Sequence, residues 1–137
     1  MTQAEFSDAD LHDLARVERY LILCLIVLFV CGAMLAGLPG LSWDAATFVG
    51  VLFLAARILS YFLYYFFLEL AHVRFGWAYV LLALLPLLAS WLGLPRTPLT
   101  SVLPILAWLM MVLHLSWINR TVFKPRGIRM GLLGPQV

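Results

Sequence analysis

Charge is scarce in this chain, and acidic charge is scarcest. Only 12% of its 137 residues are Asp, Glu, Lys or Arg, whereas soluble domains average about 25%. No Asp or Glu lies within ten residues of Arg57 on either side, and every acid in the chain lies near the end of an apolar run. This composition excludes a water-soluble domain and leaves no carboxylate in the middle of those runs for acid–base chemistry.

Motifs that commonly carry chemistry are also absent. The sequence contains no cluster of metal ligands, no Gly-rich phosphate loop and no Cys–His or Ser–His–Asp set. Cys24 and Cys31 are seven residues apart in one apolar run, about 10 Å along a helix, which is too far for a disulfide. Basic residues interleaved with aromatics do not form a patch outside the C-terminal tail, which argues against nucleic acid as a partner. We therefore expect no enzyme activity, no metal and no cofactor.

Long hydrophobic runs dominate the rest of the chain. Hydrophobic residues make up 64% of it, and they form runs of about 19 to 25 residues, close to the roughly 20 that a membrane-spanning helix needs. The sequence predicts an all-α, integral membrane four-helix bundle in which residues 1–137 form a single transmembrane domain. The expected spans are residues 16–38, 43–68, 75–94 and 100–119, separated by Pro- and Gly-containing breaks and one polar hinge.

Both ends of the chain are polar. Ser7 followed by Asp10 resembles a helix cap, and Leu11, Leu14 and Val17 then recur on one side. This pattern predicts a short interfacial N-terminal helix before the first span. Residues 120–137 form a basic tail. Its basic residues suit contact with anionic lipid head groups or with a cytoplasmic partner: Arg120, Lys124, Arg126 and Arg129.

The distribution of basic residues predicts the orientation. In a four-span arrangement, Arg96 is the only basic residue outside the spans on one side of the membrane. The others flank the opposite side: Arg16, Arg19, Arg74, Arg120, Lys124, Arg126 and Arg129. Because cytoplasmic loops carry the excess of Lys and Arg, we expect both termini in the cytoplasm and a multi-pass protein of the bacterial inner membrane.

Arg57 lies near the middle of the second span. Counting twelve residues inward from the boundary of each span places Arg57, Pro86 and Trp108 in one layer, about 18 Å deep. Pro86 cannot bond the carbonyl of Leu82, so that acceptor is free. One hypothesis is that Arg57 is satisfied within the bundle, by the following groups: the Leu82 carbonyl, Trp108, Tyr61 and Ser60. The other is that it faces an anionic group of a partner subunit, a lipid or a ligand.

A second polar layer is expected nearer the cytoplasm. Counting five residues inward from the cytoplasmic boundary of each span places Tyr64, Tyr79 and His114 at the same depth, with Tyr65 adjacent. Hydroxyl and imidazole groups at this depth can hydrogen-bond across helices. A packing layer is one interpretation, and a site for a quinone head group or a haem ligand is the other.

The end of the second span resembles a known family. Residues 55–72 are similar to the second helix of the small bacterial cytochrome c oxidase subunit IV-like proteins, in which a central basic residue precedes an aromatic, acidic and often His-containing ending. Phe67, Glu69 and His72 match that ending, whereas Leu68 replaces a Met and the basic residue lies about two positions earlier. The usual family member also has three helices. The resemblance implies an accessory, non-catalytic subunit of a haem–copper oxidase or a related respiratory complex.

Three functions therefore remain open from the sequence, and one of them is a haem- or quinone-binding electron carrier that uses the second polar layer. The other two are as follows. The first is a small accessory or scaffolding subunit of a larger inner-membrane complex, with membrane lipids and larger membrane subunits as partners. The second is a small homodimeric transporter or lipid flippase in which Arg57 binds an anion. The residues expected to contact a partner or ligand are Arg57, Tyr61, Trp108, Tyr64, Tyr79 and His114.

Overall fold

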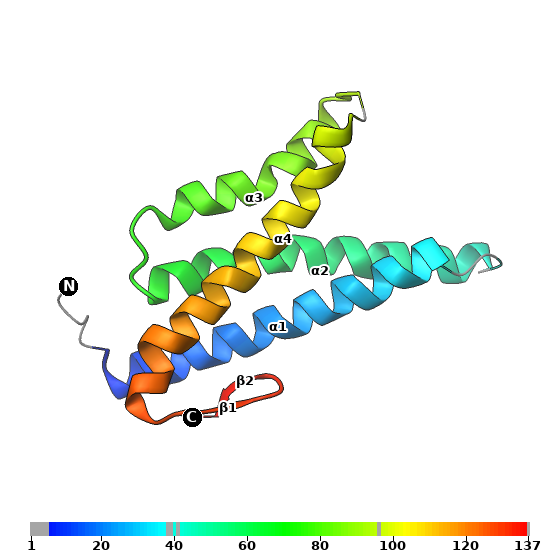
Figure 1. Ribbon diagram of the computed structural model, residues 1–137. Coiled ribbons are helices and arrows are strands. Elements are labelled where there is room, and N and C mark those ends of the chain that lie inside the picture. The colour runs from blue at the N-terminus through cyan, green and yellow to red at the C-terminus, as the bar shows by residue number, and fades with distance from the viewer. Residues whose placement is uncertain (1–5, 38–39, 41, 96, 137) are drawn as a thin grey trace.

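Four helices and a short C-terminal hairpin make up the part of the chain that the computed structural model describes, namely residues 6–37, 40, 42–95 and 97–136. The elements are α1 (Asp8–Gly37), α2 (Trp43–Leu70), α3 (Gly76–Trp91), α4 (Pro98–Ile118), the π-turn η1 (Asn119–Phe123), the 3-10 turn η2 (Lys124–Arg126), β1 (Arg129–Gly131) and β2 (Gly134–Gln136). Figure 1 shows the helices as two antiparallel pairs, α1 with α2 and α3 with α4.

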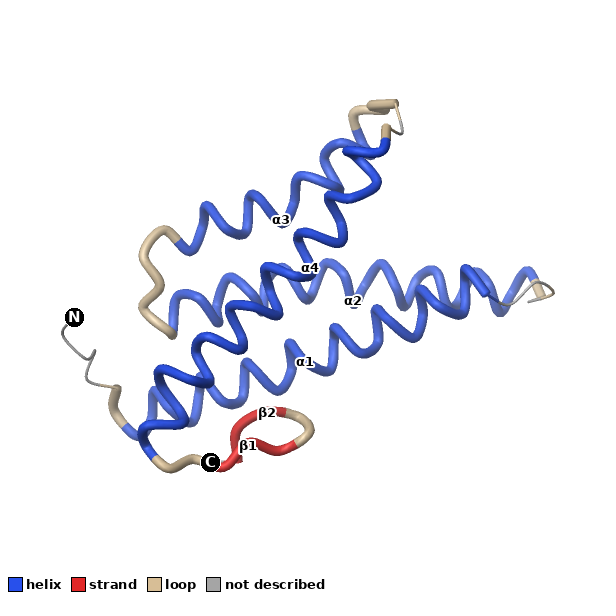
Figure 2. The backbone as a smooth tube through the Cα atoms, in the orientation of Figure 1, coloured by secondary structure: helices blue, strands red, loops and turns tan. Residues whose placement is uncertain are grey.

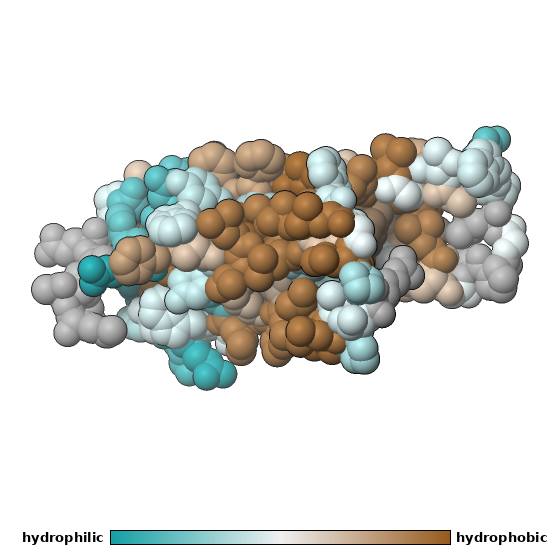
Figure 3. Space-filling model, turned by 90° about the horizontal axis from the view of Figure 1, so that it is seen from above, coloured by the Kyte–Doolittle hydropathy of each residue, from teal (hydrophilic) through white to brown (hydrophobic). Residues whose placement is uncertain are grey.

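Three of the described helices are long and apolar enough to cross a membrane: α1, α2, and α4 with its continuation to Arg126. The fourth, α3, has 16 residues, or about 24 Å of helix. It is shorter than the expected span of 75–94 because the chain leaves the helix at Gly93, which has φ +65°. Figure 3 shows hydrophobic residues across the middle of the molecule and hydrophilic residues toward both ends.

The expected short N-terminal helix is not a separate element. Ser7 and Asp10 do form the predicted cap, with the Ser7 hydroxyl donating to the Asp10 carboxylate at 2.6 Å, and this bond holds the pKa of Asp10 below its usual value. From Asp8, however, α1 continues unbroken to Gly37. No Pro or Gly interrupts these turns before Gly32, and the buried Leu11, Leu14 and Leu21 form one stripe that packs against the other helices.

The hydrophobic core lies at one end of the molecule. It is built from the first half of α1, the last turns of α2 and the end of α4, including the fully buried Leu14, Phe67 and Ile118. Toward the other end the α3–α4 pair diverges from the α1–α2 pair (Figure 1). The two helix pairs therefore form a packed end, where α1 starts and the chain's last strand lies, and an open end.

The C-terminal tail is folded rather than extended along a lipid surface. After the π-turn, β1 and β2 pair as an antiparallel hairpin, with Met130 opposite Pro135, and β2 packs against α1 (Figure 2). Phe123 and Pro135 are fully buried. The sequence suggested only a basic tail because the apolar residues that anchor it are spaced irregularly between the charges.

Two of the sequence features lie outside the described residues. These are the break at Leu38-Pro39 after the first span and the basic residue Arg96, on which part of the orientation argument depends.

Ser42, which precedes α2, accepts a hydrogen bond from the amide of Ala45 at 3.3 Å. Thr97 and Thr100 form a capping box at the start of α4, so both α2 and α4 begin with a side-chain cap.

The turn between α2 and α3 generates a stability prediction. His72 and Phe75 have left-handed φ values of 55° and 60°, and a Cβ at Gly76 would lie 3.1 Å from the Cβ of Leu68. We expect Gly76→Ala to lower the free energy of unfolding in detergent by about 1 kcal/mol, because two backbones must move apart. Gly50→Ala is the control, since nothing lies within 4 Å of its added Cβ. An equal fall in the free energy of unfolding in the two variants would contradict the close approach of Gly76 to Leu68.

Candidate functional site

Arg57 is half-buried in α2 and makes one side-chain hydrogen bond among the described residues. Its Nε donates to the hydroxyl of Tyr61, one turn later, at 3.2 Å. Tyr61 is a neutral partner, so this bond leaves the positive charge uncompensated. Ser60 does not serve the guanidinium, because its hydroxyl donates to the Arg57 backbone carbonyl at 2.7 Å.

Two cavities meet at Arg57. The smaller, of about 150 Å³, lies where all four helices approach one another, and its lining includes Tyr61, Pro86 and Trp108. The larger, of about 490 Å³, lies between α2, α3 and α4 and extends toward the open end. Its polar lining consists of Arg57 and three hydroxyl side chains, Ser90, Thr100 and Ser101. The hydroxyls of Thr100 and Ser101 donate to the Thr97 carbonyl at 2.9 and 3.2 Å, so Arg57 is the charged donor in this cavity that suits an anionic group.

The partners that the sequence suggested for Arg57 are therefore only partly in place. Tyr61 bonds it, and Trp108 lines the smaller cavity beside it. Within the described residues, Arg57 makes neither a hydrogen bond to the Leu82 carbonyl nor a cation–π contact with Trp108. The reason is the divergence of the two helix pairs, which carries α3 and α4 away from α2 toward the open end (Figure 1).

The second predicted layer is assembled at the packed end. The fully buried Tyr64 places its hydroxyl 2.7 Å from Nδ1 of His114, which joins α2 to α4. The Tyr79 ring of α3 meets the same imidazole edge-on, with 4.6 Å between ring centroids. Three helices thus contribute to one cluster. Tyr65, the neighbour in sequence, is exposed and stacks near Phe66 instead.

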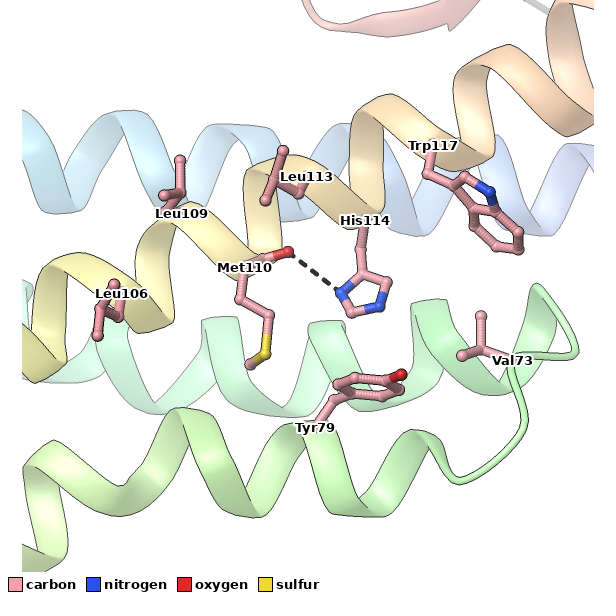
Figure 4. Close-up of a pocket in the computed structure, with 8 residues that line it drawn as sticks. All are labelled: Val73, Tyr79, Leu106, Leu109, Met110, Leu113, His114 and Trp117. Carbon is pink, nitrogen blue, oxygen red and sulfur yellow. Dashed lines mark hydrogen bonds between the residues drawn. The ribbon is translucent and has the colours of Figure 1, made fainter.

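The tautomer of His114 decides the direction of the hydrogen bond. Nδ1 also lies 3.1 Å from the Met110 carbonyl oxygen, which can only accept (Figure 4). A proton on Nδ1 would satisfy that carbonyl and make Tyr64 an acceptor, whereas a proton on Nε2 makes Tyr64 the donor. The buried Tyr64 hydroxyl has a partner in either case.

An apolar groove of about 560 Å³ runs beside this cluster. Tyr79 and His114 are its polar side chains, and Figure 4 shows Trp117 and Val73 at one end of it. The remaining lining residues are Leu106, Leu109, Met110 and Leu113. Among the described residues no group of three His, Cys, Asp or Glu side chains could hold a metal ion. The groove therefore provides an apolar surface and one imidazole, but it does not provide a set of metal ligands among the described residues.

The basic residues of the tail are all exposed at the packed end. Arg126 has local partners: its guanidinium donates to the Val122 carbonyl at 2.7 Å and lies 5.3 Å from the centre of the Phe6 ring. It therefore helps to fix the turn after α4. The other three are also exposed, Arg120 and Lys124 in the turns after α4 and Arg129 on β1 of the hairpin.

The sequence pattern did not single out Glu18 as a site residue. This residue is fully buried, and neither carboxylate oxygen has a hydrogen-bond partner. A signal was present, because Glu18 occupies the same helical stripe as Leu11, Leu14, Leu21 and Leu25, at spacings of three and four residues. Its proximity to the charged N-terminal turns concealed that position.

The residues of the family resemblance lie at the packed end, on the last turn of α2 and the following turn. Phe67 and Leu68 are buried in the core, while Glu69 and His72 are exposed. Comparison with protein-family models, with curated proteins and with solved structures finds no match. What the fold defines is an all-helical protein whose long apolar helices are compatible with a membrane.

The contact between Tyr64 and His114 generates the second prediction. Tyr64→Phe removes the hydroxyl and leaves Nδ1 without its cross-helix partner, so we expect the free energy of unfolding in detergent to fall by about 1 kcal/mol. Tyr65→Phe is the matched control, because Tyr65 is exposed and its hydroxyl has no such role. A similar, small change in both variants would show that the hydrogen bond contributes no stability.

Proposed function

We propose that this chain is a small, non-catalytic accessory subunit of a larger protein complex in the bacterial inner membrane. The observation that carries the proposal is the environment of Arg57. The guanidinium has one neutral partner, Tyr61, and lies at the junction of two cavities that the chain leaves open. A positive charge at that depth needs an anion or further hydrogen-bond acceptors, and a partner subunit can supply them.

The position of the core supports the same proposal. One end of the helices is closed by the chain's own side chains, whereas the other end diverges (Figure 1). An accessory subunit with this shape would use its packed end for its own stability and its open end for contact with another subunit. The orientation that we propose has four spans, with the packed end and both termini on the cytoplasmic side, as the basic residues favour.

The resemblance of residues 55–72 to the cytochrome c oxidase subunit IV-like proteins favours a respiratory complex as the partner. In this proposal Arg57 contacts a carboxylate, phosphate or propionate group within that complex. The exposed basic residues at the packed end would contact anionic lipid head groups: Arg120, Lys124 and Arg129.

Co-purification tests the accessory role. The tagged chain should be isolated in mild detergent together with a larger membrane subunit at a constant ratio. We expect Arg57→Gln to lower the amount of the bound subunit roughly tenfold or more, because loss of a charge-assisted contact of about 1.4 kcal/mol has that effect. Arg57 makes one side-chain hydrogen bond in the described chain, so the helical content of the variant should be unchanged by circular dichroism.

Arg74→Gln is the matched control for this experiment. Arg74 is exposed in the turn between α2 and α3, where its guanidinium lies 5.1 Å from the centre of the Phe75 ring. This variant should retain the partner. Purification of the wild-type chain as a stable, active monomer or homo-oligomer would overturn the proposal.

A transporter or lipid flippase is the second candidate, and the larger cavity favours it. Arg57, Ser90, Thr100 and Ser101 line one cavity of an otherwise apolar protein. A homodimer could close two such cavities around an anionic substrate. Pro86 lines both cavities at Arg57 and would provide the irregular helix that such pathways often contain.

Proteoliposomes that contain only this chain test the second candidate. Flux of an anionic lipid or solute should appear in the wild type and should be lost in Arg57→Ala, because the binding charge is removed. Arg74→Ala should transport normally. Flux that persists in Arg57→Ala, or no flux in any sample, would reject this function without affecting the accessory role.

A further inference from the structure

Among the described residues, three buried side-chain oxygen atoms at the packed end have no hydrogen-bond partner. They are Oε1 and Oε2 of Glu18 and Oδ1 of Asn119. The two side chains are neighbours, although Glu18 belongs to α1 and Asn119 is the first residue of the π-turn after α4. Buried polar groups normally have partners, so three unpaired acceptors at one place require an explanation.

The C-terminal hairpin closes this place from outside. Cγ and Cδ of Glu18 lie 3.7 and 3.8 Å from the point where a Cβ would stand on Gly134, the first residue of β2. Pro135, which follows, is fully buried. Figure 2 shows the hairpin alongside the first half of α1. Glu18 is therefore sealed between α1, the π-turn and β2.

No counter-charge is bound to Glu18 within the described chain. Among the described residues none of the charged side chains on the elements around it hydrogen-bonds Glu18. Six of them are exposed: Arg16 and Arg19 on α1, Arg120 and Lys124 after α4, Glu69 at the end of α2 and Arg129 on β1. β2 contributes no titratable side chain. An ionised carboxylate in this position would lack both water and a cation, which is strongly unfavourable.

One proton would satisfy all three atoms. An ionised carboxylate only accepts hydrogen bonds, so it cannot pair with the carbonyl oxygen of an amide. A protonated Glu18 can donate its O–H to Asn119 Oδ1, while the Asn119 amide group donates an N–H to the other oxygen of Glu18. This reciprocal acid–amide pair uses each of the three acceptors.

We propose that Glu18 and Asn119 form a proton-binding site that the C-terminal hairpin closes, and that release of the proton opens the hairpin. When the O–H bond of Glu18 breaks, the proton passes to water and the carboxylate must be hydrated. Hydration requires β2 to move away from α1. The closed state holds one proton more than the open state, so a rise in pH favours opening. The site thus links the C-terminal segment to the pH at the packed end.

Hydrogen exchange of the full-length protein in lipid nanodiscs tests this inference. Protection of residues 129–136, corrected for the intrinsic pH dependence of exchange, is measured from about pH 5 to about pH 9. We expect the wild type to lose protection roughly tenfold or more as the pH rises. Glu18→Gln should stay protected throughout, because its amide makes the same reciprocal pair with Asn119 and does not titrate. Asp13→Asn, an exposed position on α1, should respond like the wild type.

A pH-independent hairpin in the wild type, or the same pH response in Glu18→Gln as in the wild type, would overturn the proposal. Infrared spectroscopy of the wild type gives a test that does not depend on the folding of any variant. The carbonyl band of one protonated carboxylic acid should be present in the closed state and disappear over the pH interval in which protection is lost. A closed, protected hairpin without that band would also overturn the inference.

Discussion

A polar side chain that is withdrawn from water must be paired, and the pairing of a few such groups organises this molecule. The hydrogen bond between Tyr64 and His114 joins helices α2 and α4 across 50 residues of sequence. Tyr79 packs on the same imidazole from α3. Because leaving either group unpaired in an apolar interior is costly, this cluster favours one register of the helices. The hydrophobic core is built around it, at the packed end.

Away from that cluster, the polar side chain of Arg57 is less completely hydrogen-bonded by the chain itself. Arg57 bonds one neutral hydroxyl, and the helices that could enclose it diverge toward the open end (Figure 1). The packed end holds the hydrophobic core, while the proposed partner subunit would contact the open end. Glu18 is a different case, since its carboxylate oxygens have no hydrogen-bond partner among the described residues and the pairing proposed for it needs only a proton and the neighbouring amide. Arg57 and Glu18 are both polar groups withdrawn from water that need a hydrogen-bond or charge partner, but the partner proposed for each is different.

Much of the architecture was predictable because apolar length and helix caps are local properties. The start of α2, the capping pair Ser7 and Asp10, and the grouping of Tyr64, Tyr79 and His114 all agree with what spacing along the helices predicts. The surroundings of Arg57 were less predictable. Counting residues along each span places Trp108 level with Arg57, and both line one cavity. The count does not specify the distance between α4 and α2 at that level. The folded tail was missed because its anchors, Phe123 and Pro135, are buried by contacts with distant segments.

The sequence by itself determined that the chain is helical, that its long apolar runs suit a membrane, and that Arg57 has no acid near it along the chain. These properties depend on composition and on neighbours within a few turns. The tertiary structure alone decided that α1 and α2 separate from α3 and α4 at one end, and that Glu18 and Asn119 lie together beneath the C-terminal hairpin. Contacts between residues about a hundred positions apart, such as Glu18 and Asn119, depend on how the helices pack in three dimensions. Local periodicity does not specify that packing.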